Sequence, residues 1–282
     1  MTHALSSRVT SRKLTVCSIL FISVNVLAAA HEVVGGVNGA VASTAGLAVG
    51  ASCTSALVCI LFLAWLARFT PSVSSWIAAF SWGSGGALII AGIGNGMIDA
   101  AVEATSLGED AADVVTSVVT GPLVEEAAKG IGVLIIILAV RRLLEHPAQG
   151  AVFGALVGAG FAWGEDIGYY VSALDQGMSG LWESFLARAL LGGYGHAVYA
   201  GILGWALAWA SLRRRNVLSG VLVGIGGYLV AVLAHSQANA VGFLAPDENW
   251  NLVYGCVELP VLILGVVLLV WGMRRRRTIV EA

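Results

Sequence analysis

The chain has 282 residues, of which 58% are hydrophobic and only 11% are charged. A soluble domain has about 45–50% apolar and about 25% charged residues, so this composition excludes water as the main solvent of the chain. The formal net charge of −2 gives no reason to expect nucleic acid as a partner.

Apolar runs of about 20 residues, long enough to cross a bilayer as helices, follow one another along the chain. We predict an all-α polytopic transmembrane bundle of about eight spans, forming a single membrane domain over residues 1–282. In chain order the predicted spans are residues 14–36, 44–67, 75–98, 113–140, 150–173, 185–210, 217–244 and 252–273. The first stretch also has features of a cleavable signal peptide, and we expect it to be an uncleaved anchor.

The basic residues predict the orientation of these spans. Most of the 15 Lys and Arg residues precede the first span or lie in alternate loops, as Arg141 and Arg142 do after the fourth span. Acidic residues such as Glu109 and Asp247 lie in the opposite loops. Basic residues in short loops favour the cytoplasmic side, so we expect an integral membrane protein with both termini in the cytoplasm.

Ionisable and polar residues interrupt four successive spans, the fourth to the seventh. An ionisable side chain inside a span costs at least about 2.5 kcal/mol, so each one requires a partner or a function. The residues concerned are Glu125, Glu126, Lys129, Glu165, Asp166, Arg188, His196, His235 and Asn239. We predict that Lys129 is the counter-ion of the neighbouring carboxylates, and that Arg188 either extends its guanidinium to the membrane surface or pairs with Glu165 or Asp166.

Four of these residues lie at a similar depth. Counting from the outer end of each span at about 1.5 Å per residue places Glu125, Glu165, His196 and His235 about 13 to 18 Å deep. Because the helices alternate in direction, sequence spacing does not force this agreement. We therefore predict one polar site, in the outer half of the membrane or near its midplane. Pro122 is expected to kink or restart the fourth helix just before Glu125.

Four motifs contain these residues, and they occur in a fixed order in a core at about 113–244. They are Gly121-Pro-Leu-Val-Glu-Glu-Ala-Ala-Lys129, Phe161-Ala-Trp-Gly-Glu-Asp-Ile-Gly-Tyr169, Gly195-His-Ala-Val-Tyr-Ala-Gly201 and His235-Ser-Gln-Ala-Asn239. Over about residues 121–240 the chain resembles the PrsW family of intramembrane proteases, which is distantly similar to the CAAX-protease and bacteriocin-processing membrane peptidases. Asp166 departs from the family pattern, in which asparagine is expected.

The resemblance implies an intramembrane endopeptidase that hydrolyses a peptide bond in or near the membrane-spanning region of a membrane protein. Its candidate catalytic residues are Glu125, Glu126, Glu165, His196, His235 and Asn239. A single-span membrane protein such as an anti-sigma factor would suit the family as substrate. The resemblance also implies a bacterial cell membrane as the location and the lipid bilayer as the surroundings.

The residues allow two mechanisms. In the first, Glu125 or Glu126 is the general base without a metal, the two histidines hold water and protonate the leaving amine, and Asn239 binds the oxyanion. In the second, Glu165, His196 and His235 bind Zn²⁺ and Glu126 is the base. The sequence contains no HExxH motif, the pattern most specific for a zinc protease.

Two other functional classes are alternatives to a protease. A proton- or ion-coupled secondary transporter also buries carboxylates and histidines near the midplane, although it more often contains an inverted repeat, which this sequence lacks. A non-catalytic membrane scaffold with the same fold would have no need of the glutamate, histidine and asparagine set.

Overall fold

The computed structural model describes residues 42–66, 73–212, 216–244 and 249–280, and this part of the chain contains helices and no strands. The predicted all-α class is therefore confirmed. The first predicted span, residues 14–36, lies outside the described residues. In chain order the helical elements are α2 (Ala42–Leu66), α3 (Val73–Ser81), η1 (Trp82–Ala87), α4 (Leu88–Glu103), α5 (Glu109–Val114), η2 (Val115–Thr120), α6 (Gly121–Val140), α7 (Pro147–Ala173), η3 (Leu174–Gln176), α8 (Gly177–Phe185), η4 (Leu186–Gly192), α9 (Gly195–Leu212), α10 (Val217–Leu244) and α11 (Trp250–Val280).

Each of the other seven predicted spans falls on helical structure. Within the described part of the chain, four stretches are long and apolar enough to cross a membrane by length and composition alone, namely Gly46–Leu66, Val73–Glu103, Val217–Leu244 and Leu252–Gly272. The remaining three predicted spans correspond to α6, α7 and the pair η4 and α9, which contain the ionisable residues of the motifs. The total of about eight spans and their orientation remain predictions.

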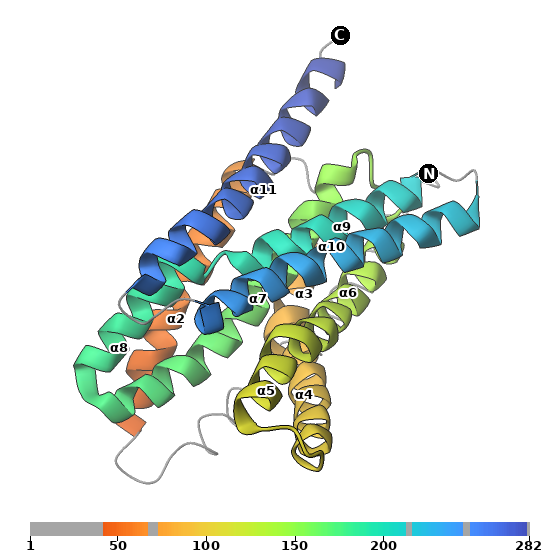
Figure 1. Ribbon diagram of the computed structural model, residues 1–282. Coiled ribbons are helices and arrows are strands. Elements are labelled where there is room, and N and C mark those ends of the chain that lie inside the picture. The colour runs from red at the N-terminus through yellow and green to blue at the C-terminus, as the bar shows by residue number, and fades with distance from the viewer. Residues whose placement is uncertain (1–41, 67–72, 213–215, 245–248, 281–282) are drawn as a thin grey trace.

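Helix α7 forms the centre of the bundle (Figure 1). Nearly all of its side chains from Ala148 to Ala162 are buried, on every face of the helix. It packs against α9, α2, α3, η1 and α6. A helix buried on all sides has neighbours that fix both its rotation and its height, so the acidic residues of its C-terminal half are held in one place.

Glycines allow α7 to approach α9 very closely. Gly150, Gly154 and Gly158 are spaced four apart and therefore share one face. A Cβ added at any of the three would overlap with the backbone of α9, and at Gly158 it would overlap with the carbonyl oxygen of His196. Small residues at such an interface permit tight packing between helices in lipid. The glycine face therefore determines where α9 places the His196 backbone.

Large apolar side chains face outward on several helices. Exposed examples are Leu218, Leu222 and Leu229 on α10 and Ile263 and Leu264 on α11. Broad exposed apolar surfaces are rare on soluble monomers and indicate contact with a membrane or a partner. This distribution agrees with the membrane assignment made from composition.

The helices that contain the motifs are irregular near the polar residues. The stretch before α6 is the π-helical η2, and α6 restarts at Gly121 with Pro122 in its first turn, as predicted. A second π-helical stretch, η4, contains Arg188 and ends just before α9. π-Helical turns are frequent at functional sites because they change the direction of side chains.

Candidate active site

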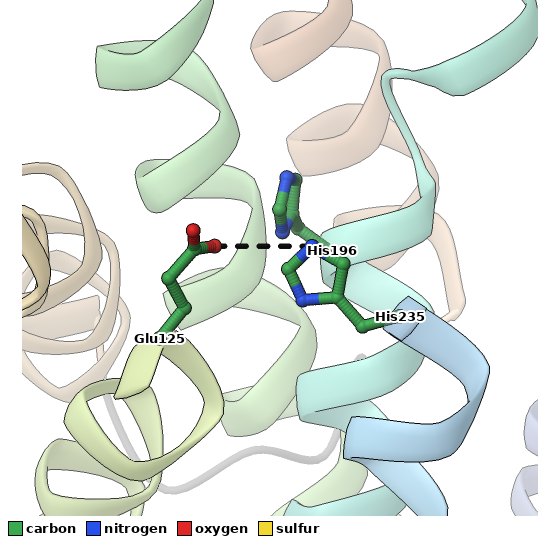
Figure 2. Close-up of side chains that lie close together, drawn as sticks. All are labelled: Glu125, His196 and His235. Carbon is green, nitrogen blue, oxygen red and sulfur yellow. Dashed lines mark ion pairs between the residues drawn. The ribbon is translucent and has the colours of Figure 1, made fainter. Parts of the chain in front are cut away.

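Three side chains from three helices point toward one another inside the bundle (Figure 2). Glu125 is on α6, His196 on α9 and His235 on α10. All three are buried, as are Glu126 and Lys129 of α6. The structure therefore brings together residues that the depth estimate assigned to one layer.

Lys129 lies at the centre of this cluster and has no exposed surface. Its ammonium nitrogen is 2.8 Å from Glu126 Oε1, 3.6 Å from Glu125 Oε2 and 2.8 Å from His196 Nδ1. It also lies 4.0 Å from the centre of the Phe161 ring. The prediction that Lys129 is the counter-ion of the two carboxylates is confirmed by these distances.

His235 is held by Glu126 and by an aromatic neighbour. Its Nδ1 is 3.1 Å from Glu126 Oε1, and its ring stacks on Tyr199 with 5.3 Å between the ring centres. If Nδ1 carries the proton that it donates to Glu126, Nε2 keeps a lone pair. That Nε2 faces Glu125, 3.8 Å from its Oε2.

His196 has a partner at each ring nitrogen. Lys129 can donate a hydrogen bond to Nδ1, and Nε2 lies 3.0 Å from Glu165 Oε2. The rings of His196 and His235 meet edge to face, with 4.8 Å between their centres. Glu165 therefore contacts the cluster through His196.

A second ionic network holds Glu165 in place. Arg188 of η4 donates hydrogen bonds to both Glu165 and Asp166, in agreement with the second of its two predicted roles, and its guanidinium lies over the Tyr169 ring. Asp166 also accepts a hydrogen bond of 3.4 Å from Ser55 on α2. The departure from asparagine at this position thus supplies a second carboxylate for Arg188. Through Glu165, the network links α2, α7 and η4 to Nε2 of His196.

Glu125, His196 and His235 form the group best placed to hold a metal ion. One ligand atom from each lies within 4.8 Å of the others. Glu125 Oε1 accepts a hydrogen bond from Asn95, whereas the buried Oε2 has no hydrogen-bond partner among the described residues. Two imidazoles and one carboxylate are a known ligand set of catalytic zinc sites. When each ligand atom lies about 2.0 Å from a tetrahedral zinc ion, the ligand atoms lie about 3.3 Å from one another. The donor types therefore match zinc, and the ligand atoms, which lie up to 4.8 Å apart, would have to move closer together to bind it.

Glu165 was predicted from the sequence as the carboxylate ligand, and the geometric group contains Glu125 instead. The Glu165 carboxylate lies at Nε2 of His196, away from the Lys129 contact at Nδ1, and it accepts a hydrogen bond from Arg188. One contact must change when a metal binds, because Lys129 already lies against His196 Nδ1. Zn²⁺ carries one more positive charge than the Lys129 ammonium, so a metal in its place at His196 would still supply a cation beside the two carboxylates.

Asn239 does not contact the acidic cluster in this structure. Its amide donates a 2.9 Å hydrogen bond to the carbonyl of Ser117 in η2, one helical turn beyond His235. This bond ties α10 to the segment that leads into Glu125. The contact suits an anchoring residue, and a direct role for Asn239 with an oxyanion remains a prediction.

Three polar residues near the site were not predicted from the sequence. Asn95 of α4 contacts Glu125, and Tyr199 of α9 stacks on His235 and donates a hydrogen bond to the buried Glu258 of α11. A polar residue in an apolar span was the only available signal for Asn95 and Glu258, and it does not identify the partner.

A sequence model described as PrsW family intramembrane metalloprotease matches residues 71–275, which is most of the chain. The chain belongs to this family. It is therefore a membrane protease, and the transporter alternative receives no support. Neither the curated proteins nor the solved structures that were compared gave a match.

Proposed function

We propose that this PrsW family protease is a zinc enzyme in which Glu125, His196 and His235 bind the metal. The observation that carries the proposal is the convergence of these three buried side chains, together with Glu125 Oε2, which has ion-pair neighbours but no hydrogen-bond partner among the described residues. When bound, zinc would polarise the scissile carbonyl and make a bound water more acidic.

The protein side chains would supply the proton transfers. Glu126 holds Lys129 and His235 through Oε1, while its buried Oε2 has no hydrogen-bond partner among the described residues. Glu126 would take a proton from the attacking water as the water oxygen bonds to the carbonyl carbon. It would then give this proton to the amine nitrogen as the carbon–nitrogen bond breaks.

The remaining polar residues would position this machinery. Glu126 fixes the tautomer of His235, and the pair of Arg188 and Glu165 fixes the ring of His196. Carboxylates that hydrogen-bond to metal-binding histidines orient the ligands and raise their basicity, and loss of one typically costs 10–100-fold in metal affinity or activity. Glu165 thus acts through His196 in this proposal.

The choice between Glu125 and Glu165 as the ligand can be tested by measuring zinc. Full-length protein purified in detergent should hold one zinc per chain by elemental analysis, and a strong chelator should remove zinc and activity together. Glu125→Gln should lose the metal, whereas Glu165→Gln should still fill the site at high zinc with weaker affinity. Zinc retained by Glu125→Gln and lost by Glu165→Gln would transfer the ligand role to Glu165. Full activity in metal-free protein would overturn the zinc mechanism.

The proposed substrate is a single-span membrane protein, for which an anti-sigma factor is the specific candidate, in a bacterial cell membrane. This proposal rests on the family and on the burial of the site among helices that carry apolar outer surfaces. A peptide bond reaches such a site only where the substrate helix is locally unwound, because a helix shields its carbonyl groups in hydrogen bonds.

The proposed topology has about eight spans with both termini in the cytoplasm. It rests on the alternation of basic and acidic loops. In a background without native cysteines, Glu109→Cys should react with an impermeant thiol reagent added outside intact cells. Leu143→Cys should react only after the membrane is opened, since this exposed residue lies in the loop that contains His146. Reaction of both cysteines from the same side would overturn the topology.

A further inference from the structure

A groove with a volume of about 830 Å³ lies away from the acidic cluster, between the C-terminal ends of α6 and α9 and the N-terminal end of α10. These three helices run side by side in Figure 1. Apolar side chains line most of the groove, and Arg141, Arg142 and Asn216 lie at one end. The size is within the range of about 300–1,000 Å³ that is usual for small-molecule sites.

The groove is about as deep as one leaflet of a bilayer. On α6 and the turn that follows it the lining runs from Leu134 to Arg142, and on α10 and the residue before it from Asn216 to Ile225. These stretches correspond to about 12 and 14 Å at 1.5 Å per residue. Half of a hydrocarbon core of about 30 Å is about 15 Å. The depth therefore matches an acyl chain, whereas a substrate helix would need a groove across the full membrane.

The end of the groove that contains Arg141 and Arg142 is positively charged. Among the described residues that line the groove, Arg141 and Arg142 are the only charged ones. Both are exposed, and neither forms an ion pair within the part of the chain that the structure describes. Guanidinium groups bind phosphate oxygens through paired hydrogen bonds. Two adjacent arginines above an apolar groove at a membrane surface thus complement a phosphate that carries acyl chains.

We infer that this groove binds an anionic phospholipid, with the phosphate on Arg141 and Arg142 and an acyl chain along α6, α9 and α10. Basic pockets between transmembrane helices are known to take anionic headgroups. The lipid would contact the same helix that carries Glu125, Glu126 and Lys129. The inference is independent of the zinc site and of the proposed substrate.

The test compares binding of phosphatidylglycerol and phosphatidylcholine to the full-length protein in detergent, by native mass spectrometry. Wild type should prefer phosphatidylglycerol. Arg141→Gln with Arg142→Gln should reduce the preference by about fivefold for each arginine, because a basic residue near the membrane surface contributes about 1 kcal/mol. The matched pair Arg141→Lys with Arg142→Lys should keep most of the preference, since the charge remains. An unchanged preference in the glutamine variant would overturn the inference.

The acyl part of the inference has its own matched pair on α10. Gly220→Leu should fill the groove and weaken the binding of both lipids, whereas Gly226→Leu should not, because Gly226 is exposed and outside the lining. Equal lipid binding by the two variants would overturn the acyl placement. Displacement of the lipid by millimolar inorganic phosphate would indicate a free-phosphate site instead. Slower substrate cleavage by Gly220→Leu, with lipid binding unchanged, would assign the groove to the substrate.

Discussion

Glu126→Gln should lower the rate of substrate cleavage by about 10² or more, the effect expected when a general base is lost. The amide keeps the size and one acceptor oxygen of the carboxylate, so His235 and Lys129 keep a hydrogen-bond partner. What disappears is the group that accepts the proton from water. The site should still fill at high zinc, with weaker affinity, because Glu126 contacts the proposed ligand His235 and is not itself one of the three proposed ligands.

The measurement is the rate of cleavage of a single-span substrate by purified protein, with the product mapped by mass spectrometry. Glu103→Gln is the matched control, because Glu103 is exposed at the end of α4 and should keep wild-type activity. Thermal unfolding in detergent separates loss of chemistry from loss of fold. If Glu126→Gln does not fold, Glu126→Asp keeps the charge, moves the carboxylate back by one methylene and should still lose most activity. A folded Glu126→Gln that cleaves within a few-fold of wild type would show that another group is the base.

The sequence was sufficient to predict that ionisable side chains from successive helices converge in one cluster. Ionisable residues are so costly in lipid that Glu125, His196 and His235 stood out against apolar surroundings. Helical rise then predicted a similar depth for them, in agreement with their mutual contacts, and their depth in the membrane stays a prediction. The resemblance to the PrsW family rested on the same residues, and the match over residues 71–275 confirmed it.

The sequence was insufficient to choose the carboxylate that faces both histidines. Depth along a helix says nothing about the rotation of that helix, and rotation decides whether Glu125 or Glu165 turns toward His235. In the structure the rotation of α7 is fixed by close contacts such as that between Gly158 and the backbone of His196, and Arg188 draws Glu165 to the far side of that ring. These are contacts between distant segments, which no single motif contains.

Shared helical spacing was also an incomplete guide. His235 and Asn239 are four residues apart and were expected to serve one site, yet Asn239 contacts the Ser117 carbonyl. One turn of helix corresponds to about 5.4 Å, which is enough to bring a different neighbour within reach. Glu258 was missed for the related reason that its partner, Tyr199, lies on another helix.

Lys129→Met should lower the free energy of unfolding of the metal-free protein by about 3–5 kcal/mol, the cost of leaving buried charges without their partner. Lys129 is the cation nearest to both Glu125 and Glu126, and neither it nor Glu126 has any exposed surface. Methionine has a similar length and is apolar, so packing changes little while the positive charge is lost.

Zinc should partly reverse this loss, because a metal ion on Glu125 and the histidines supplies positive charge at nearly the same place. Binding to the folded state alone stabilises it, by about 2.7 kcal/mol at a ligand concentration 100 times the dissociation constant. In wild type the metal must exchange with the Lys129 contact to His196, whereas in Lys129→Met it need not. Zinc should therefore raise the unfolding temperature of Lys129→Met more than that of wild type.

Thermal unfolding in detergent, with chelator and with saturating zinc, measures both effects in one experiment. Arg142→Met is the matched control, because it removes an exposed cation just after α6 and should leave stability and the zinc response close to wild type. Wild-type stability of metal-free Lys129→Met would show that the carboxylates do not depend on this ammonium. An equal zinc-induced rise in wild type and Lys129→Met would show that the metal and the ammonium do not compete, so that zinc must bind without disturbing the contact between Lys129 and His196.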